Sequence, residues 1–167
     1  TYSFEPTLRG TAGALIPVSD RFTSTFLVVY GDNFFHCDLA RLLATHRRGG
    51  GIGTMALWEW PQVSQSGIAR LEPDGRIAEF TEKPPADRAF SPLINAGLLV
   101  WEPGVLRYIP RDEPSDFSRD VIPAVLAAGE RLDGYVMRDP ELLLWIDRPE
   151  DYERARQVAE RRLAISP

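Results

Sequence analysis

The sequence has little of what would tie it to an oxidising or membrane environment. Its 167 residues include a single cysteine, Cys37, so an internal disulfide is excluded and a reducing compartment fits. No apolar run is long enough to cross a bilayer, and no signal-peptide pattern is present. These absences predict a soluble, cytoplasmic protein with no membrane partner.

The sequence also lacks a surplus of basic residues. It has 24 acidic and 19 basic side chains, for a net charge of -5. This balance argues against a general nucleic-acid surface, although a local cationic pocket for phosphates would not show in the sum. With 44% hydrophobic and 26% charged residues, the composition predicts one ordinary domain over residues 1–167 with a sizeable core.

Lysine is nearly absent. Lys83 is the one lysine against eighteen arginines, and it lies in the run Phe80-Thr81-Glu82-Lys83-Pro84. An ammonium is a compact point charge that meets a single phosphate oxygen, whereas a guanidinium suits planar bidentate contacts. The choice of lysine here suggests a phosphate contact. The alternative is an Arg-rich composition in which Lys83 is an ordinary loop residue.

A short apolar run that stops at a carboxylate is the second feature present. Residues 26–30 read as a buried parallel strand, and Gly31-Asp32-Asn33 follows at once. In open α/β sheets, ligands bind beyond the carboxyl ends of the strands, so Asp32 is expected at such a crevice. The alternative is an Asx turn that closes the strand.

The rest of the chain alternates between strand and helix patterns. Asp38 is expected to cap a helix over 39–46 that ends before Gly49. Strands are expected at 52–58 and 93–101, a hairpin at 68–72 and 76–80, and helical segments at 105–109, 116–126 and 149–163. Pro123 favours a late start for the second of these helices, and a Glu150–Arg154 pair is expected on the last. The alternation predicts a mostly parallel sheet with helices on both faces.

Five short motifs follow one another in a familiar order, namely Glu5-Pro-Thr-Leu-Arg-Gly10-Thr11-Ala-Gly13, Tyr30-Gly31-Asp32-Asn33, Glu82-Lys83-Pro84, Asn95-Ala-Gly97 and Trp145-Ile-Asp147. From Glu5 to about Ala155, the chain resembles the sugar-1-phosphate nucleotidyltransferases, also called NDP-sugar pyrophosphorylases. The resemblance implies a Rossmann-like α/β fold of the nucleotide-diphospho-sugar transferase type. It also implies an enzyme that joins a nucleoside triphosphate to a sugar 1-phosphate, giving NDP-sugar and pyrophosphate, and it is compatible with a homo-oligomer.

That reaction needs mainly positioning and cationic screening of the phosphoryl oxygens. Mg²⁺ is typically held by one or two carboxylates plus substrate phosphates. The resemblance implies that Asp32 and Asp147 are catalytic Mg²⁺ ligands and that Lys83 holds the sugar phosphate. It further implies substrate contacts for Glu82 with a sugar hydroxyl, Gly67 and Asn95 in the sugar pocket, and Gly10, Thr11 and Gly13 beside the nucleobase.

Several of these residues also have structural readings. Asp147 would cap the last helix, Asn95 would form a bulge in its strand, and Gly10 and Gly13 would simply begin a helix. Trp58 and Trp60 are read as core and edge residues rather than a base-stacking platform.

Two departures from the family bear on activity. The family opens with a strand and a Gly-rich loop carrying basic residues, and no such segment precedes Thr1. The chain is therefore read as the C-terminal portion of a nucleotidyltransferase catalytic domain, expected to be inactive alone. The loop after Asp147 is also shorter than the family pattern and contains Arg148. The alternative function is a non-catalytic nucleotide-sugar-binding or regulatory subunit of the same fold.

Overall fold

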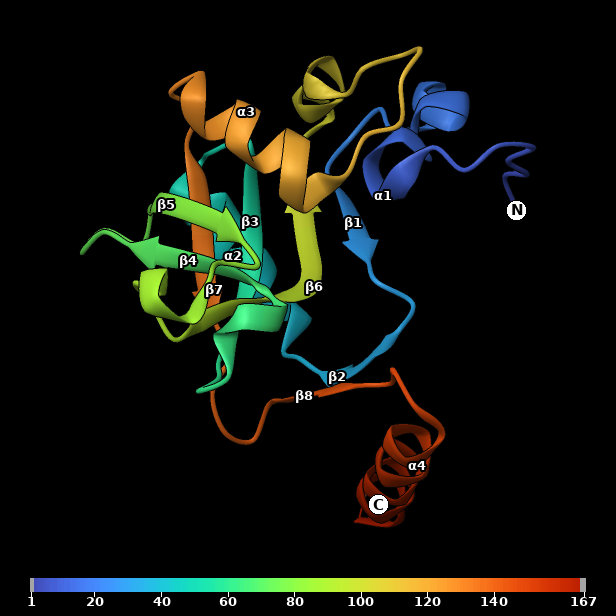
Figure 1. Ribbon diagram of the computed structural model, residues 1–167, viewed down its shortest axis with the longest axis vertical. Coiled ribbons are helices and arrows are strands. Elements are labelled where there is room, and N and C mark those ends of the chain that lie inside the picture. Colours follow the sequence, from blue (N-terminus) through green and yellow to red (C-terminus); the bar gives the residue numbers. More distant parts are fainter. Residues whose placement is uncertain (1, 166–167) are drawn as a thin grey trace.

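The computed structural model describes residues 2–165, and a six-stranded sheet forms its centre (Figure 1). The strands run in the order β5-β4-β6-β3-β7, and β1 pairs with the second half of β6. A separate two-stranded ribbon joins β2 to β8. The strands are β1 Phe26–Val29, β2 Asn33–His36, β3 Gly53–Glu59, β4 Gly67–Leu71, β5 Ile77–Glu82, β6 Leu93–Trp101, β7 Leu132–Val136 and β8 Leu142–Trp145.

The sheet mixes two strand directions. β1, β3, β4 and β7 share one direction, and β5 and β6 run against them. Because β6 lies between β3 on one side and β1 and β4 on the other, only the β3–β7 ladder of this sheet is parallel within residues 2–165. The predicted α/β class is confirmed, and most strands do share a direction, but adjacent strands pair mainly antiparallel.

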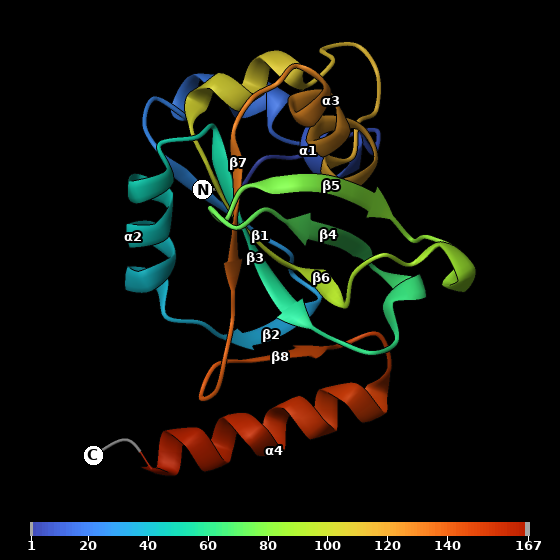
Figure 2. The same cartoon turned by 90° about the vertical axis from the view of Figure 1, so that its left-hand side faces the viewer.

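Helices cover both faces of the sheet, as predicted (Figures 1 and 2). On one face, Leu42 of α2 packs into a cluster with Ala56, Ile94 and Leu98. On the other face, α3 and the π turn before it contribute to the cluster around Trp101. The helices are α1 Gly10–Gly13, α2 Leu39–Gly49, α3 Ile122–Ala127 and α4 Pro149–Ile165, and the π turn is Phe117–Val121. No helix of the described residues is long and apolar enough to span a membrane.

Local signals explain several elements. The Asp38 carboxylate accepts a hydrogen bond of 3.0 Å from the Arg41 backbone N–H, which caps α2 as predicted. The helix ends at Gly49, three residues later than the predicted 46, because Gly50 and not Gly49 takes the left-handed conformation, with φ 64°. Pro123 stands in the first turn of α3, so this helix does start late, at Ile122.

The prediction that residues 26–30 form a buried parallel strand is wrong. β1 is antiparallel to β6 and pairs with no other strand of the described residues. Leu27 and Val29 are 40% and 52% exposed, while Phe26 and Val28 pack against the core. An apolar run is read as fully buried when nothing in it alternates, but successive side chains point to opposite faces, and here one face of the strand is left uncovered.

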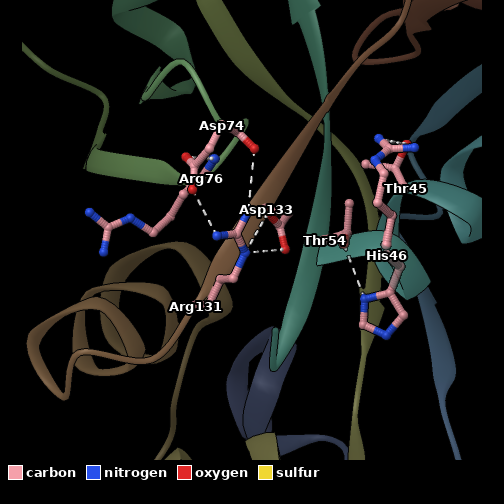
Figure 3. A network of polar contacts seen from close by, with 8 residues as sticks. Thr45, His46, Thr54, Asp74, Arg76, Arg131 and Asp133 are labelled. Carbon is pink, nitrogen blue, oxygen red and sulfur yellow. Dashed lines mark hydrogen bonds and ion pairs between the residues drawn. The ribbon is translucent and has the colours of Figure 1, made fainter. Parts of the chain in front are cut away.

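A clamp of charged residues fixes the turn of the β4–β5 hairpin to β7 (Figure 3). The Arg131 guanidinium donates to Asp74 Oδ2 at 2.8 Å and to Asp133 Oδ1 at 2.7 Å. Asp133 is 3% exposed, and the Gly134 N–H donates to the Gly75 carbonyl at 2.9 Å. The clamp holds the closed end of the hairpin and so determines where its open end lies.

Candidate functional site

The open end of the β4–β5 hairpin faces a cavity of about 790 Å³. The β2–β8 ribbon and the start of α4 form the opposite wall. The structure brings together six of the residues singled out from the sequence, and all of them line this cavity: Asp32, Gly67, Glu82, Lys83, Asn95 and Asp147. Segments more than a hundred residues apart in the sequence thus meet at one place.

Lys83 sits at the end of β5 in a strained backbone conformation. Its φ of 47° is the single positive φ among the non-glycine residues that the structure describes. Such a conformation costs about 1–3 kcal/mol and persists where the surroundings over-determine it, often at functional sites. The Lys83 N–H donates to the Ser66 carbonyl at 3.1 Å, and within residues 2–165 its ammonium makes no ion pair. Its charge is therefore left for a ligand.

Gly67 makes room for the neighbouring carboxylate. It pairs with Glu82 across the β4–β5 ladder, and a Cβ atom on Gly67 would lie 2.6 Å from Glu82 Oε2 and still closer to the Phe80 ring. A larger residue would push the Glu82 side chain out of its place on the cavity wall. The glycine is thus needed for the geometry of this wall.

The half-buried Glu82 has its pKa raised, chiefly because burial penalises the carboxylate. The Lys83 ammonium opposes this shift and the Asp116 carboxylate adds to it. Burial likewise raises the pKa of Tyr30, which lines the cavity beside Glu82. The charge of Glu82 therefore depends on its burial and on its charged neighbours.

Asp32 and Asp147 approach the cavity from two loops that are tied together. Asp32 lies in the turn between β1 and β2, and its carbonyl accepts a hydrogen bond of 2.9 Å from Ile146 N–H, next to Asp147. The carboxylate that bonds to the backbone at the start of α4 is that of Asp151, which accepts from Arg148 N–H at 3.1 Å. Asp147 therefore does not take the capping role offered as its alternative.

The two aspartates fit a hard divalent cation that also binds substrate phosphates. Among the residues described, no group of three or more His, Cys, Asp or Glu side chains is arranged to hold a metal by itself. Mg²⁺ needs only one or two protein carboxylates, since it keeps waters and phosphate oxygens as its remaining ligands. The donor set of Asp32 and Asp147 suits that mode of binding and does not suit an all-protein cage.

Asn95 lies at a bulge in its strand and also faces the cavity. It flanks an irregularity in the β3–β6 ladder, where Gly97 has a φ of 71°. The Asn95 Oδ1 accepts a hydrogen bond of 2.9 Å from the Gly97 N–H, so the bulge itself orients the amide. The side chain also lines the cavity.

Gly10, Thr11 and Gly13 lie outside the cavity lining. Gly10 has a φ of 79°, and a Cβ atom there would collide with the Ser115 carbonyl. The Thr11 hydroxyl donates to Asp116 Oδ2 at 2.8 Å and accepts from Phe117 N–H at 3.0 Å. Gly10 begins α1, as its structural reading held, Gly13 ends it, and all three residues attach this turn to the segment before the π turn.

The sequence did not single out several cavity residues. Trp60 lies 5.1 Å from Trp145, ring centre to ring centre, in an edge-to-face arrangement, and both line the cavity. The predicted Glu150–Arg154 pair is not formed; Arg154 lines the cavity instead. The other cavity residues missed are Tyr30, Asn33, Gln62, Gln65, Ser66, Ser118, Arg148 and Asp151. Of these, Tyr30, Asn33 and Arg148 gave a sequence signal, since Tyr30 and Asn33 flank Gly31-Asp32 and Arg148 follows Asp147.

Comparison with known proteins agrees with this geometry. The Nucleotidyl transferase family matches residues 1–158, and the chain belongs to that family. The UTP–glucose-1-phosphate uridylyltransferase of Synechocystis sp. is 34% identical over 125 residues, which cover 72% of this chain and 32% of the relative. The mannose-1-phosphate guanylyltransferase of Mycobacterium tuberculosis is 33% identical over 165 residues, covering 95% and 44%. The chain thus spans about a third to a half of the length of such curated relatives.

Solved structures confirm the fold. A UDP-glucose pyrophosphorylase solved with UDP-glucose superposes with a TM-score of 0.80 at 17% identity, covering 97% of this chain and 66% of that one. HddC from Yersinia pseudotuberculosis superposes with a TM-score of 0.70 at 22% identity, covering 90% and 63%. The predicted nucleotide-diphospho-sugar transferase type of fold is therefore confirmed.

Proposed function

We propose that this protein transfers a nucleotidyl group from a nucleoside triphosphate to a sugar 1-phosphate, releasing pyrophosphate. The observation that carries the proposal is the cavity itself, where the unpaired Lys83 shares one space with Asp32 and Asp147. Relatives at 33–34% identity are named for this reaction with glucose 1-phosphate and mannose 1-phosphate. The cavity residues supply the kinds of charge that the reaction requires.

In the proposed reaction, an oxygen of the sugar phosphate attacks the α-phosphorus as the bond to the β-phosphate breaks. The Lys83 ammonium holds the attacking phosphate and screens its charge, which lowers the repulsion between the two anionic substrates. Glu82 accepts a hydrogen bond from a sugar hydroxyl, and the Asn95 amide contacts the sugar from the opposite strand. Gly67 leaves the space in which the sugar ring lies.

Asp32 and Asp147 are proposed to hold Mg²⁺, which would neutralise charge on the phosphoryl oxygens. The backbone hydrogen bond from the Ile146 N–H to the Asp32 carbonyl joins the two loops, so it keeps the two aspartates at a fixed separation. Gly10, Thr11 and Gly13 keep their proposed place beside the nucleobase, outside the lining of the sugar cavity.

The test is a pyrophosphate-release assay on the full-length gene product. Glucose 1-phosphate and mannose 1-phosphate are each paired with UTP, ATP, GTP, CTP and dTTP in the presence of Mg²⁺. The proposal expects turnover with at least one pair and its loss in Asp32→Asn, while Asp20→Asn, an exposed acidic control outside the cavity, stays active. Binding of an NDP-sugar without turnover by any pair would favour a non-catalytic binding protein instead.

A further inference from the structure

Ser118 stands on the cavity wall but belongs to none of the motifs. Its side chain is 6% exposed, and its Oγ accepts a hydrogen bond of 3.4 Å from Asn95 Nδ2. A buried hydroxyl that faces a polar cavity is costly unless its hydrogen bonds are satisfied. The groups around this hydroxyl therefore indicate its role.

The contact with Ser118 completes the orientation of Asn95. Gly97 N–H donates to Asn95 Oδ1 at 2.9 Å, which fixes the carbonyl end of the amide. The amino end points at Ser118 and keeps one further N–H for another acceptor. Held at both ends, the amide cannot flip, so a ligand in the cavity meets a donor rather than an acceptor.

The Ser118 hydroxyl also influences Glu82 and Tyr30, which line the same cavity, because it lowers the pKa of each of these groups. A serine hydroxyl has one proton and two lone pairs, and Asn95 fills one of the lone pairs. Because a carboxylate only accepts, the proton of Ser118 is the group through which the serine lowers the pKa of Glu82.

The π turn holds Ser118 firmly in this position. The Asp116 carboxylate accepts from Ser118 N–H at 2.9 Å and from the Thr11 hydroxyl at 2.8 Å. The Asp120 carboxylate in turn accepts from Asp116 N–H at 2.7 Å. Single π turns are rare and occur frequently at functional sites, where they re-aim a side chain. Here the turn aims the hydroxyl of Ser118 between two strands.

We propose that Ser118 is a positioning residue that aims the Glu82 carboxylate and the Asn95 amide at the sugar ring of the substrate. The proposal rests on the proposed function, because it assumes that the cavity takes a sugar 1-phosphate. With Ser118 in place, the Glu82 carboxylate offers an acceptor and the Asn95 amide offers a donor on neighbouring walls of the cavity. This pattern suits a pair of adjacent sugar hydroxyls.

The test compares two buried serines of the same segment. Ser118→Ala should weaken binding of the sugar 1-phosphate roughly two- to twelvefold, which is the range for a net hydrogen bond of about 0.5–1.5 kcal/mol. Binding of the nucleoside triphosphate should not change. Ser115→Ala is the matched control, because Ser115 is 2% exposed, its Oγ has no hydrogen-bond partner in the described structure, and it lies outside the cavity lining.

The pH dependence separates positioning from packing. The Ser118 hydroxyl lowers the pKa of Glu82, so removing it should raise that pKa further. The acidic limb of the binding profile, meaning the pH range in which affinity for the sugar 1-phosphate falls on acidification, should then move to higher pH. The other charged groups facing Glu82 are Lys83, Asp116 and Arg119, with the Tyr30 hydroxyl nearby, and they are the same in both variants. Ser115→Ala should leave the limb where it is.

A double-mutant cycle with Asn95→Ala gives a second readout. Losses in the double variant that are clearly smaller than the sum of the single losses support a shared role. The inference is overturned if Ser118→Ala and Ser115→Ala have the same affinity for the sugar 1-phosphate and the same pH dependence of binding. It is also overturned if the losses of Ser118→Ala and Asn95→Ala simply add in the double variant. If the unmodified protein binds none of the sugar 1-phosphates, the proposed function fails first, and the two failures are distinguishable.

Discussion

The two ends of the β4–β5 hairpin differ in whether their positively charged side chain is paired with carboxylates. At the turn, the Arg131 guanidinium is bound by Asp74 and by the buried Asp133. At the open end, Lys83 has no ion pair within the described part of the chain and is held at a φ of 47°. One end of the same hairpin is fully paired, and the other is strained and unpaired.

This difference distinguishes charged residues that stabilise the fold from charged residues that remain free to bind a ligand. A structural cation is matched inside the protein, because a buried carboxylate such as Asp133 is costly without a partner. A cation that binds phosphate must stay free in the empty site. Substitutions at the turn should therefore cost stability and spare binding, and substitutions at the open end should do the reverse.

The largest effect is expected at the carboxylates opposite Lys83. Asp147→Asn should lower turnover by about two or more orders of magnitude, because preorganised charge stabilisation at the phosphoryl group is lost. The midpoint of unfolding should stay close to that of the unmodified protein, since the helix start is bonded by Asp151 instead. Pyrophosphate release at several Mg²⁺ concentrations and thermal unfolding are measured on the same sample. A variant that unfolds early but turns over normally when folded would reverse the assignment.

Lys83→Gly should separate binding from stability. Loss of a charge-assisted hydrogen bond should weaken sugar 1-phosphate binding by about 1.5–3 kcal/mol, or roughly ten- to more than a hundredfold. Glycine tolerates the positive φ of this position, so the free energy of unfolding should stay constant or rise by up to about 1 kcal/mol. Calorimetric titration and denaturant unfolding check the two quantities. Lys83→Arg should not fully restore binding, because a planar fork does not suit a point-charge contact.

The sequence predicted the elements whose signals are local. β6 matches the expected strand at 93–101 because its run is apolar apart from Asn95 and Gly97 and is bounded by Pro92 and Pro103. The hairpin followed from Pro73-Asp74-Gly75, and the α2 cap followed from Asp38. The strands β2 and β7 were missed, because each has four or five residues and pairs with a partner about eighty to a hundred residues away.

The residues of the candidate site were likewise found where the local sequence gave a signal and missed where it did not. Lys83 was found because it is the one lysine of the sequence, and Asp32 because it follows an apolar run. Ser118, Trp60 and Arg154 were missed, because tertiary packing and not sequence spacing brings them to the cavity. The expected Glu150–Arg154 pair failed since an exposed pair of this kind contributes only a few tenths of a kcal/mol, too little to hold the arginine.

At the turn end, Asp133→Ala should destabilise the fold and spare binding. Its removal leaves part of the Arg131 guanidinium unpaired, and we expect the free energy of unfolding to fall by about 2–3 kcal/mol. Glu79→Ala is the control, because Glu79 pairs with Arg70 on the exposed surface of the same hairpin and should matter much less. Unfolding in denaturant measures the difference. A weakened affinity for sugar 1-phosphate in the folded Asp133→Ala variant would mean that the two ends are not independent.

The smallest effect concerns the pH dependence of Glu82. Because its pKa in the folded protein is raised above the ordinary 4.5, sugar-phosphate binding should weaken at a pH above 4.5 as the solution is acidified. The sign for stability is opposite: the contribution of Glu82 is present at acidic pH and is lost as the pH rises through the raised pKa. Glu82→Gln should remove both dependences. Affinity and unfolding measured across acidic pH in the two proteins check this, and an unchanged acidic limb in Glu82→Gln would contradict it.

Hydrogen–deuterium exchange with and without a sugar 1-phosphate tests the contrast between the hairpin ends most directly. With glucose 1-phosphate and mannose 1-phosphate as probes, we expect a ligand to slow exchange at residues 66–68, 82–84 and 146–151. Exchange at residues 73–76 and 131–134, around the Arg131 clamp, should not change. Slower exchange confined to the clamp, or no change at the open end with either probe, would contradict the assignment of the Lys83 end as the binding site.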